Sequence, residues 1–503
     1  MGGFYIKLLN LHHYHCMFGL KGPNMEIASL KLKNHPILHD LELNFCDENG
    51  MPYKNIVFAG ENGTGKTTLL ELINSVVGNM RVFLLERHKF DLTMEVRFSK
   101  EEQVALKKVL GAPTFSFDEN IDMSVMVLTY SKPISDHQAD NYSFSFSNKI
   151  YKHLASKRRI AKFCRSVYSN AGMDFDTQSI TSITSSQIDV AQDVHEPLQN
   201  SSSPMKLKQV LIDISAQDND DFCNWARLNP KAAMEDYTTP SRMSRFSSAF
   251  HKMFDKISFK GIETQNAQKQ VVFEKADISI LLEELSSGEK QIVFRGGCLL
   301  KNIGILDGTV ILVDEPEISM HPRWQRKIFS FYSDLFKTET EQKSQIFFAT
   351  HSEYVLKDAM DKKAQIIVLT EQENAVKAES VNNKFVLPFG PTYAEIKYFA
   401  FNIPTIEFHD ELYGYIQEKN GREKENEMEE FLKTNGVKQE KPWSRLKDGV
   451  FKSVQKLTLM TYIRNFYHHP EASRNERNLL HPLEPSDEEM RQSIDCMINI
   501  LQG

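Results

Sequence analysis

Four short segments contain the residue types that bind and hydrolyse a nucleoside triphosphate. In chain order they read GENGTGKT at 60–67, LSSGE at 285–289, VILVDE at 310–315 and THS at 350–352. Each is short, but the set supplies a glycine-rich loop with a lysine, paired carboxylates after an apolar run, and a histidine after another apolar run. The sequence therefore predicts an ATPase.

The first segment matches the phosphate-loop pattern G-x-x-x-x-G-K-[ST], with the apolar run 56–59 before it and a helical pattern at 67–77 after it. Its glycines let consecutive backbone N–H groups converge on phosphate oxygens, and the helix N-terminus adds a favourable dipole. Lys66 would reach the β- and γ-phosphates, and Thr67 would ligate Mg²⁺. The residues predicted to bind ATP here are Gly60, Asn62, Gly63, Gly65, Lys66, Thr67 and Thr68.

Two later strand ends would complete the chemistry. Apolar residues 310–313 lead into Asp314 and Glu315, as in a buried parallel strand that delivers acids to the open edge of a sheet. Asp314 would hold Mg²⁺ through water, and Glu315 would be the catalytic base that polarises the attacking water. His351 would bind the γ-phosphate and orient that water, so the predicted catalytic residues are Lys66, Glu315 and His351. For an isolated Asp-Glu pair a solvated loop is the alternative, and the other segments argue against it.

These segments resemble the ABC-type ATPase family, in its SMC-like and DNA-repair-like branch. The resemblance depends on LSSGEKQ at 285–291, which is similar to the signature motif in its Ser-x-Gly-Glu form. It implies an α/β fold, an ABC-type head in which a phosphate-loop sheet with helices is joined by an antiparallel β subdomain. It also implies that Ser286 and Gly288 contact ATP held by a second copy, so ATP would join two heads. The same residues would also cap a helix, and the two interpretations are compatible.

The glutamine loop of that family has only one candidate here. Gln138 follows the apolar strand predicted at 124–129, and a merely polar loop is the favoured alternative for it. The coupling between nucleotide state and the rest of the molecule is therefore left open.

The composition is that of a globular protein. Of 503 residues, 41% are apolar and 25% are charged, and the length allows one large core or two to three smaller ones. No run of 18 apolar residues occurs, and the N-terminus does not read as a secretion signal, so no membrane span is expected. Six cysteines without a CxxC pair indicate reduced thiols in a cytoplasm and argue against a zinc site.

The formal net charge of −7 gives no overall attraction to nucleic acid. A basic segment at 149–165, with Tyr151 and Phe163 among its cations, is a candidate for DNA or RNA contact. A solvated helix face is the favoured alternative.

Changes in composition predict five regions. Residues 1–24 form an N-terminal appendage, 25–140 the first part of the ATPase lobe, and 141–260 a helical insertion with a mobile Ser/Thr-rich segment at 170–203. Residues 261–390 complete the ATPase lobe, and 391–503 form a helical C-terminal module. No heptad pattern persists over three or four repeats, so no long coiled-coil arm is expected.

The tail contains a second chemical candidate, TYIRNFYHHPE at 461–471. Arg464 and His468 would share a helix face, as would Asn465 and His469. The span resembles the R-x4-6-H motif of HEPN ribonucleases, with Arg464, Asn465 and His469 matching it. That resemblance implies metal-independent attack of an RNA 2′-hydroxyl on the adjacent phosphate. A helix cap or an oligomer contact is the favoured alternative.

As a whole, the chain resembles the ATPase subunits of bacterial anti-phage systems, including the Septu ATPase that also occurs with retrons. This resemblance implies an ATPase that oligomerises and regulates a separate effector nuclease, such as an HNH protein. One alternative is a toxin in which the ATPase gates a HEPN ribonuclease in its own tail. Another is a DNA-repair clamp.

Overall fold

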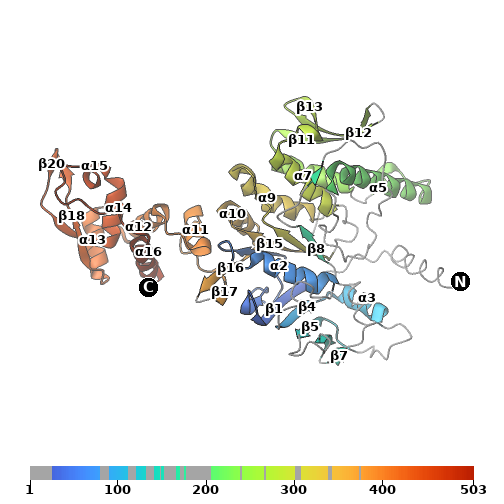
Figure 1. Cartoon of the computed structure of the whole chain (residues 1–503), viewed down its shortest axis with the longest axis horizontal. Helices are drawn as coiled ribbons and strands as arrows, with labels where there is room; N and C mark the ends of the chain where they lie inside the picture. Colours follow the sequence, from blue (N-terminus) through green and yellow to red (C-terminus); the bar gives the residue numbers. More distant parts are fainter. Residues whose placement is uncertain are drawn as a thin grey trace. The chain divides into compact units, whose positions relative to one another are not determined.

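The computed structural model describes residues 25–79, 90–110, 121–131, 141–147, 149–151, 166–169, 175–176, 205–237, 241–265, 268–300, 308–337, 342–372 and 375–502. The chain divides into two compact units, Met1–Glu379 and Ser380–Gly503 (Figure 1). Each unit has its own apolar core. Several expected features lie outside the described residues: the appendage at 1–24, Gln138, most of the basic segment and nearly all of the Ser/Thr-rich segment.

A six-stranded sheet, in the order β17-β16-β3-β15-β14-β8, forms the centre of the first unit. The pairings from β8 through β14, β15 and β3 to β16 are all parallel. Strands β3 and β14 are buried along their whole length, which explains why their sequences are continuous apolar runs. The strands are β3 Asn55–Ala59, β8 Ser166–Ser169, β14 Val310–Asp314, β15 Gln345–Thr350, β16 Gln365–Gln372 and β17 Ala375–Ser380.

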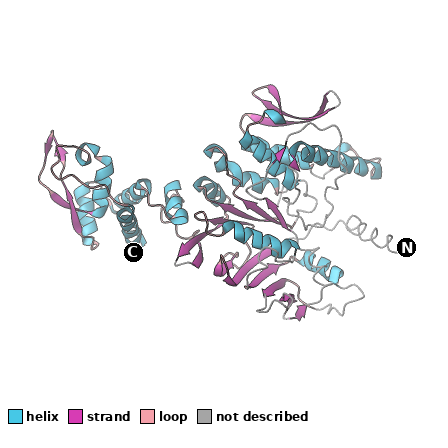
Figure 2. Cartoon of the chain, viewed as in Figure 1, coloured by secondary structure: helices cyan, strands magenta, loops and turns pink. Residues whose placement is uncertain are grey.

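Helices cover both faces of this sheet (Figure 2). Helix α2 (Lys66–Asn74) contacts β14, β15 and β8, while α10 (Glu353–Asp361) contacts β3, β16 and α9 (Pro322–Leu335). Because parallel strands all end at one edge, the loops after β3, β14 and β15 meet there. The sheet thus brings three of the four predicted segments to one place.

A second six-stranded sheet is antiparallel in all its pairings, in the order β2-β1-β4-β5-β6-β7. Buried and less buried residues alternate along β4 and β5, as expected when one face of a sheet packs on the core. The strands are β1 Glu26–His35, β2 His39–Asn44, β4 Asp91–Arg97, β5 Val125–Ser131, β6 Asn141–Phe146 and β7 Lys149–Tyr151, and helix α3 (Lys100–Leu110) lies between β4 and β5 in the sequence.

The region expected to be a helical insertion, 141–260, differs from that expectation. Its first residues extend the antiparallel sheet as β6 and β7, and β8 is the strand beside β14 in the parallel sheet. Helices α5 (Leu207–Leu228) and α6 (Arg242–Met253) then lead into an antiparallel sheet of β11 (Ile257–Gln265), β12 (Gln268–Lys275) and β13 (Ile278–Leu281), followed by α7 (Ser287–Leu300). The two six-stranded sheets of the first unit therefore draw on residues well beyond the boundary expected at 140.

The second unit is mainly helical, as expected for the C-terminal module. Its core lies between α12 (Ile406–Asn420), α14 (Leu459–His468) and α16 (Asp487–Gln502). The other helices are α11 Tyr393–Phe401, α13 Glu425–Thr434 and α15 Pro470–Ser473. Two small antiparallel pairs were not anticipated: β18 (Gln439–Trp443) with β21 (Gln455–Thr458), and β19 (Leu446–Lys447) with β20 (Val450–Phe451).

The predicted α/β class is confirmed, with a phosphate-loop sheet, covering helices, an antiparallel β subdomain and a helical C-terminal module. Within the described ranges, none of the helices combines the length and the apolar character needed to cross a bilayer.

Candidate active site

The phosphate loop connects β3 to α2. Its three glycines, Gly60, Gly63 and Gly65, have positive φ angles of 139°, 86° and 86°. At Gly60 a Cβ atom would lie 2.2 Å from the carbonyl oxygen of Leu369, so only glycine fits at this position. Gly65 is the N-cap of α2 and has no side chain to cap it, which leaves the first N–H groups of the helix available to an anion.

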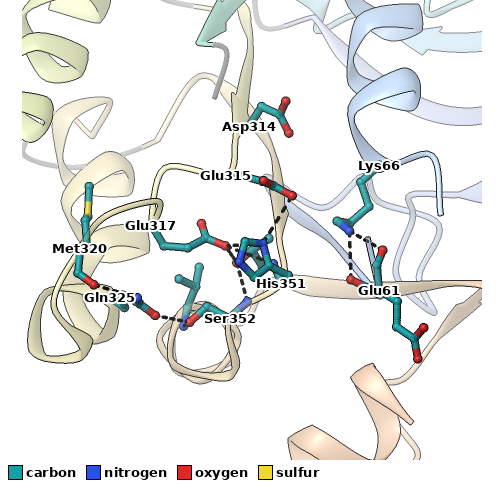
Figure 3. A network of polar contacts seen from close by, with 12 residues as sticks. Glu61, Lys66, Asp314, Glu315, Glu317, Met320, Gln325, His351 and Ser352 are labelled. Carbon is teal, nitrogen blue, oxygen red and sulfur yellow. Dashed lines mark hydrogen bonds and ion pairs between the residues drawn. The ribbon is translucent and has the colours of Figure 1, made fainter. Parts of the chain in front are cut away.

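Lys66 lies over this loop. Its ammonium donates hydrogen bonds to the carbonyl oxygens of Gly60 at 2.9 Å and Glu61 at 2.8 Å (Figure 3). Burial lowers the pKa of Lys66, while the Glu315 and Asp314 carboxylates oppose that shift. The lysine is thus held at the mouth of the loop, on the side of the paired carboxylates.

Thr67 and Asp314 meet across the site. The Thr67 hydroxyl donates to Asp314 Oδ2 at 3.1 Å and Oδ1 at 3.2 Å, although 247 residues separate the two along the chain. Burial raises the pKa of Asp314, and the Thr67 hydrogen bond opposes the shift. A hydroxyl and a carboxylate at this spacing are oxygen ligands of the kind that Mg²⁺ prefers.

These two residues fit a magnesium ion that takes its remaining ligands from phosphate and water. Mg²⁺ in ATPase sites is bound through one or two carboxylates plus substrate phosphates rather than by an all-protein cage. The described part of the chain contains no group of three or more His, Cys, Asp or Glu side chains that could hold a metal.

Tyr168 is a member of the site that sequence reasoning missed. Its hydroxyl, on β8, donates to Asp314 Oδ2 at 3.3 Å. Burial raises the pKa of Tyr168, and the Asp314 charge raises it further, so the phenol is a neutral donor. No signal in the sequence marked it, because β8 was not predicted to be a strand of this sheet.

Glu315 and His351 face one another at the edge of the sheet (Figure 3). Glu315 Oε1 lies 3.4 Å from His351 Nδ1, and the two side chains are 20% and 43% exposed, so substrate and water can reach both. Glu315 has a φ of 38°, which is uncommon for a residue other than glycine, and its N–H donates to the Ala349 carbonyl at 3.0 Å. Strained backbone of this kind is concentrated at functional sites.

Glu317 also belongs to the site, although it was not among the predicted site residues. It is buried, and its Oε1 accepts hydrogen bonds from the Thr350 hydroxyl and, at 3.1 Å, from the His351 N–H. Burial raises the pKa of Glu317, and these hydrogen bonds oppose the shift. The only sequence signal was a third carboxylate in DEPE at 314–317, which reads like a solvated loop residue.

A chain of polar contacts joins the loop after β14 to the start of α10. The Ser352 hydroxyl donates to Gln325 Oε1 at 2.6 Å, and Gln325 Nε2 donates to the Met320 carbonyl at 3.0 Å. Ser352 Oγ also caps α10 by accepting from the Val355 N–H. The turn that carries His351 is therefore held from both of its ends.

The signature segment caps α7, as one of its two interpretations predicted. The Ser286 N–H donates to Glu289 Oε2 at 2.7 Å and the Glu289 N–H to Ser286 Oγ at 3.4 Å, a capping box. Ser286 is exposed, whereas Gly288 is buried where a Cβ would lie 3.0 Å from the Trp324 ring. Their contact with ATP of a second copy stays a prediction.

A model of the AAA ATPase domain family matches residues 25–356, well over half of the chain. The chain belongs to this family. It is also 22% identical over 395 residues to the retron Ec83 probable ATPase of Escherichia coli, and the match covers 67% of this chain and 70% of that protein. The chain is therefore an ATPase, which confirms the activity predicted from the four segments.

Solved structures of SMC heads are also similar to this ATPase. The SMC head bound to the C-winged helix domain of ScpA has a TM-score of 0.43 at 13% identity, covering 71% of this chain and 99% of that one. The Pyrococcus furiosus head with an extended coiled coil, bound to the C-terminal domain of ScpA, has a TM-score of 0.38 at 12% identity and covers 71% and 96%. The head from Thermotoga maritima has a TM-score of 0.36 at 13% identity and covers 71% and 99%.

The tail motif lies in the second unit of the ATPase, on α14. Arg464 stacks over the Tyr413 ring, with its guanidinium carbon 5.3 Å from the ring centroid. One turn further along the helix, His468 Nε2 lies 2.6 Å from Asp410 Oδ2. Two of these groups, Arg464 and His468, share a helix face, as expected.

Asn465 and His469 lie in different surroundings. Asn465 is fully buried and donates through Nδ2 to Glu425 Oε2 at 3.2 Å. His469 follows the last residue of α14, and its Nδ1 lies 3.0 Å from Glu471 Oε1. The three residues matched to the HEPN motif, Arg464 included, thus have three separate partners.

Proposed function

We propose that this ATPase holds ATP and Mg²⁺ between the first units of two copies and, through that nucleotide state, regulates a separate effector nuclease in anti-phage defence. The observation that carries the proposal is the convergence of Lys66, Glu315 and His351 at the open edge of one parallel sheet. The chain also belongs to an ATPase family and is similar to a retron ATPase.

In hydrolysis, Glu315 accepts a proton from a water whose oxygen attacks the γ-phosphorus, and the bond to the β–γ bridging oxygen breaks to release ADP. Lys66 neutralises charge on the β- and γ-phosphates, and His351 orients the γ-phosphate. Bound Mg²⁺ would be held by Thr67 and Asp314 and would neutralise charge that develops on the phosphates.

The start of α7 favours a shared site. Ser286 is exposed at the N-terminus of a helix of fourteen residues, where N–H groups and the helix dipole favour an anion. We infer that Ser286 and Gly288 bind the γ-phosphate of ATP on a second copy, so that ATP joins two heads and hydrolysis releases them.

The regulatory role rests on the relative. A retron-associated ATPase implies defence partners, and an effector nuclease such as an HNH protein, as in Septu systems, is the partner that we propose. Co-expression with an HNH nuclease, the partner proposed here, tests it. We expect nuclease activity on plasmid to be low with the wild-type ATPase or Glu315→Gln and high with Lys66→Ala, because only the last cannot hold ATP. Nuclease activity that is equal with all three proteins would contradict the regulation.

RNA cleavage by the second unit is a second candidate. The observation in its favour is that His468 is exposed on the same face of α14 as Arg464 and pairs with Asp410 of α12. Purified ATPase incubated with tRNA tests it, with His468→Ala and His469→Ala as variants. Cleavage that His469→Ala abolishes would favour the HEPN assignment, whereas cleavage that only His468→Ala abolishes would shift the active pair to Arg464 and His468. Among the described residues, none favours a DNA-repair clamp.

A further inference from the structure

Glu317 occupies an unusual position for a carboxylate. It is 2% exposed, and its Oε2 atom is buried without a hydrogen-bond partner among the described residues. A buried ionisable group costs free energy unless its surroundings compensate for it. Because burial of this carboxylate beside the catalytic centre costs free energy, we expect it to have a function, and its contacts indicate which.

Two hydrogen bonds of the Glu317 carboxylate reach the turn after β15. Its Oε1 accepts from the Thr350 hydroxyl and from the His351 N–H. Thr350 Oγ1 in turn accepts the Ser352 N–H at 3.1 Å. One carboxylate oxygen thus anchors both the backbone of His351 and the residue before it.

The His351 ring also lies near this oxygen and near Glu315. His351 Nδ1 lies 3.6 Å from Glu317 Oε1 and 3.4 Å from Glu315 Oε1, and both distances exceed that of a good N–H···O hydrogen bond. A ring nitrogen carries one proton and can make one strong hydrogen bond at a time. The imidazole therefore lies between two acids, close to both (Figure 3).

We propose that Glu317 is a positioning residue that fixes the turn carrying His351 and so sets the position of the His351 ring beside Glu315. This inference rests on the roles of Glu315 and His351 under the proposed function.

Steady-state ATPase assays and ATP binding of the full chain test the proposal. Glu317→Ala should lower kcat by about 10- to 100-fold with ATP affinity changed less than about twofold, since an interaction used only in the transition state affects kcat. Glu317→Gln keeps one acceptor oxygen and should restore part of the loss. The control Glu371→Gln, an exposed carboxylate on β16, should turn over like the wild type.

A double-mutant cycle separates positioning from simple support of the fold. In a His351→Ala background, Glu317→Gln should change kcat by less than about twofold, because the residue acts through His351. An equal fold-loss of kcat in both backgrounds would overturn the proposal. If Glu317→Ala does not fold, Thr350→Val removes one anchor and should lower kcat about threefold at unchanged ATP affinity; wild-type turnover of both Thr350→Val and Glu317→Gln would also overturn it.

Failure of the inference and of the proposed function can be told apart. Wild-type turnover of Glu315→Gln would remove Glu315 as the base and both proposals with it. If Glu315→Gln is inactive while Glu317→Ala turns over normally, only the role of Glu317 is lost.

Discussion

Glu315 Oε1 and His351 Nδ1 lie 3.4 Å apart, although helix α9 and strand β15 separate the two residues along the chain. Adjacent parallel strands, β14 and β15, end side by side and present both residues at one edge. A carboxylate and an imidazole at this spacing can share one water and one phosphate.

Glu315→Gln should lower kcat by about 10²- to 10⁴-fold, because the amide cannot accept the proton of the attacking water. ATP should still bind, since Lys66 and the phosphate loop are unchanged. The trapped nucleotide should stabilise a dimer that light scattering detects in the presence of ATP. Unchanged turnover would show that Glu315 is not the base.

Mixing two inactive variants tests the shared site. Lys66→Ala should lose ATP binding, whereas the control Lys362→Ala, an exposed lysine at the end of α10, should not. Ser286→Arg should bind ATP and yet turn over at about 1% of the wild-type rate or less. The mixture should regain turnover, because one intact site forms from the loop of Ser286→Arg and the signature of Lys66→Ala. Two variants that stay inactive when mixed would argue against a composite site.

Tyr168→Phe should raise the Mg²⁺ concentration needed for half-maximal ATPase activity by about fivefold, which corresponds to the loss of one hydrogen bond of about 1 kcal/mol. The hydroxyl that it removes donates to Asp314. Mg²⁺-dependent binding of a fluorescent ATP analogue gives a measurement independent of turnover. Tyr53→Phe is the control, and equal Mg²⁺ dependence of both variants would remove Tyr168 from the metal site.

The raised pKa of Glu102 leads us to expect that the stability of the chain depends on pH. Burial raises its pKa to about 7, from an ordinary value of 4.5, while hydrogen bonds from Ser99 oppose the shift. Between these two values the unfolded chain ionises at Glu102 and the folded chain does not, so the contribution of this residue to stability falls as pH rises and levels off above about 7.

Glu102→Gln should therefore stabilise the chain at about pH 7.5 relative to about pH 5, by a few kcal/mol at most. Urea denaturation at both pH values measures this. Glu101→Gln is the matched control, since Glu101 is the exposed neighbour on the same helix. If the free energy of unfolding has the same pH dependence in the two variants, Glu102 is not the group with the raised pKa.

The phosphate loop, the paired acids and the histidine could be predicted because their chemistry is local. Positive φ angles at Gly60, Gly63 and Gly65 and a lysine at the start of a helix require only consecutive residues. The apolar runs before Asp314 and His351 indicated buried strands for the same reason.

The role of β8 could not be predicted, because a strand of four residues has no periodicity of its own that marks it. Its pairing with β14 depends on the order of strands in the sheet, and only that order brings the Tyr168 hydroxyl within hydrogen-bond distance of Asp314. The candidate glutamine at 138 was sought after a strand, β5, that belongs to the antiparallel sheet.

The sequence by itself determined that this chain is a phosphate-loop ATPase and that two acids and a histidine follow buried strands, since short-range patterns encode the loop and the strands that carry them. Only the tertiary structure decided that Glu317 is buried against His351, that Asn465 is buried beside Glu425, and that His468 pairs with Asp410. Burial and pairing across the chain depend on which elements pack together. The identity of a carboxylate or an imidazole does not reveal its partner before the fold has placed one beside it.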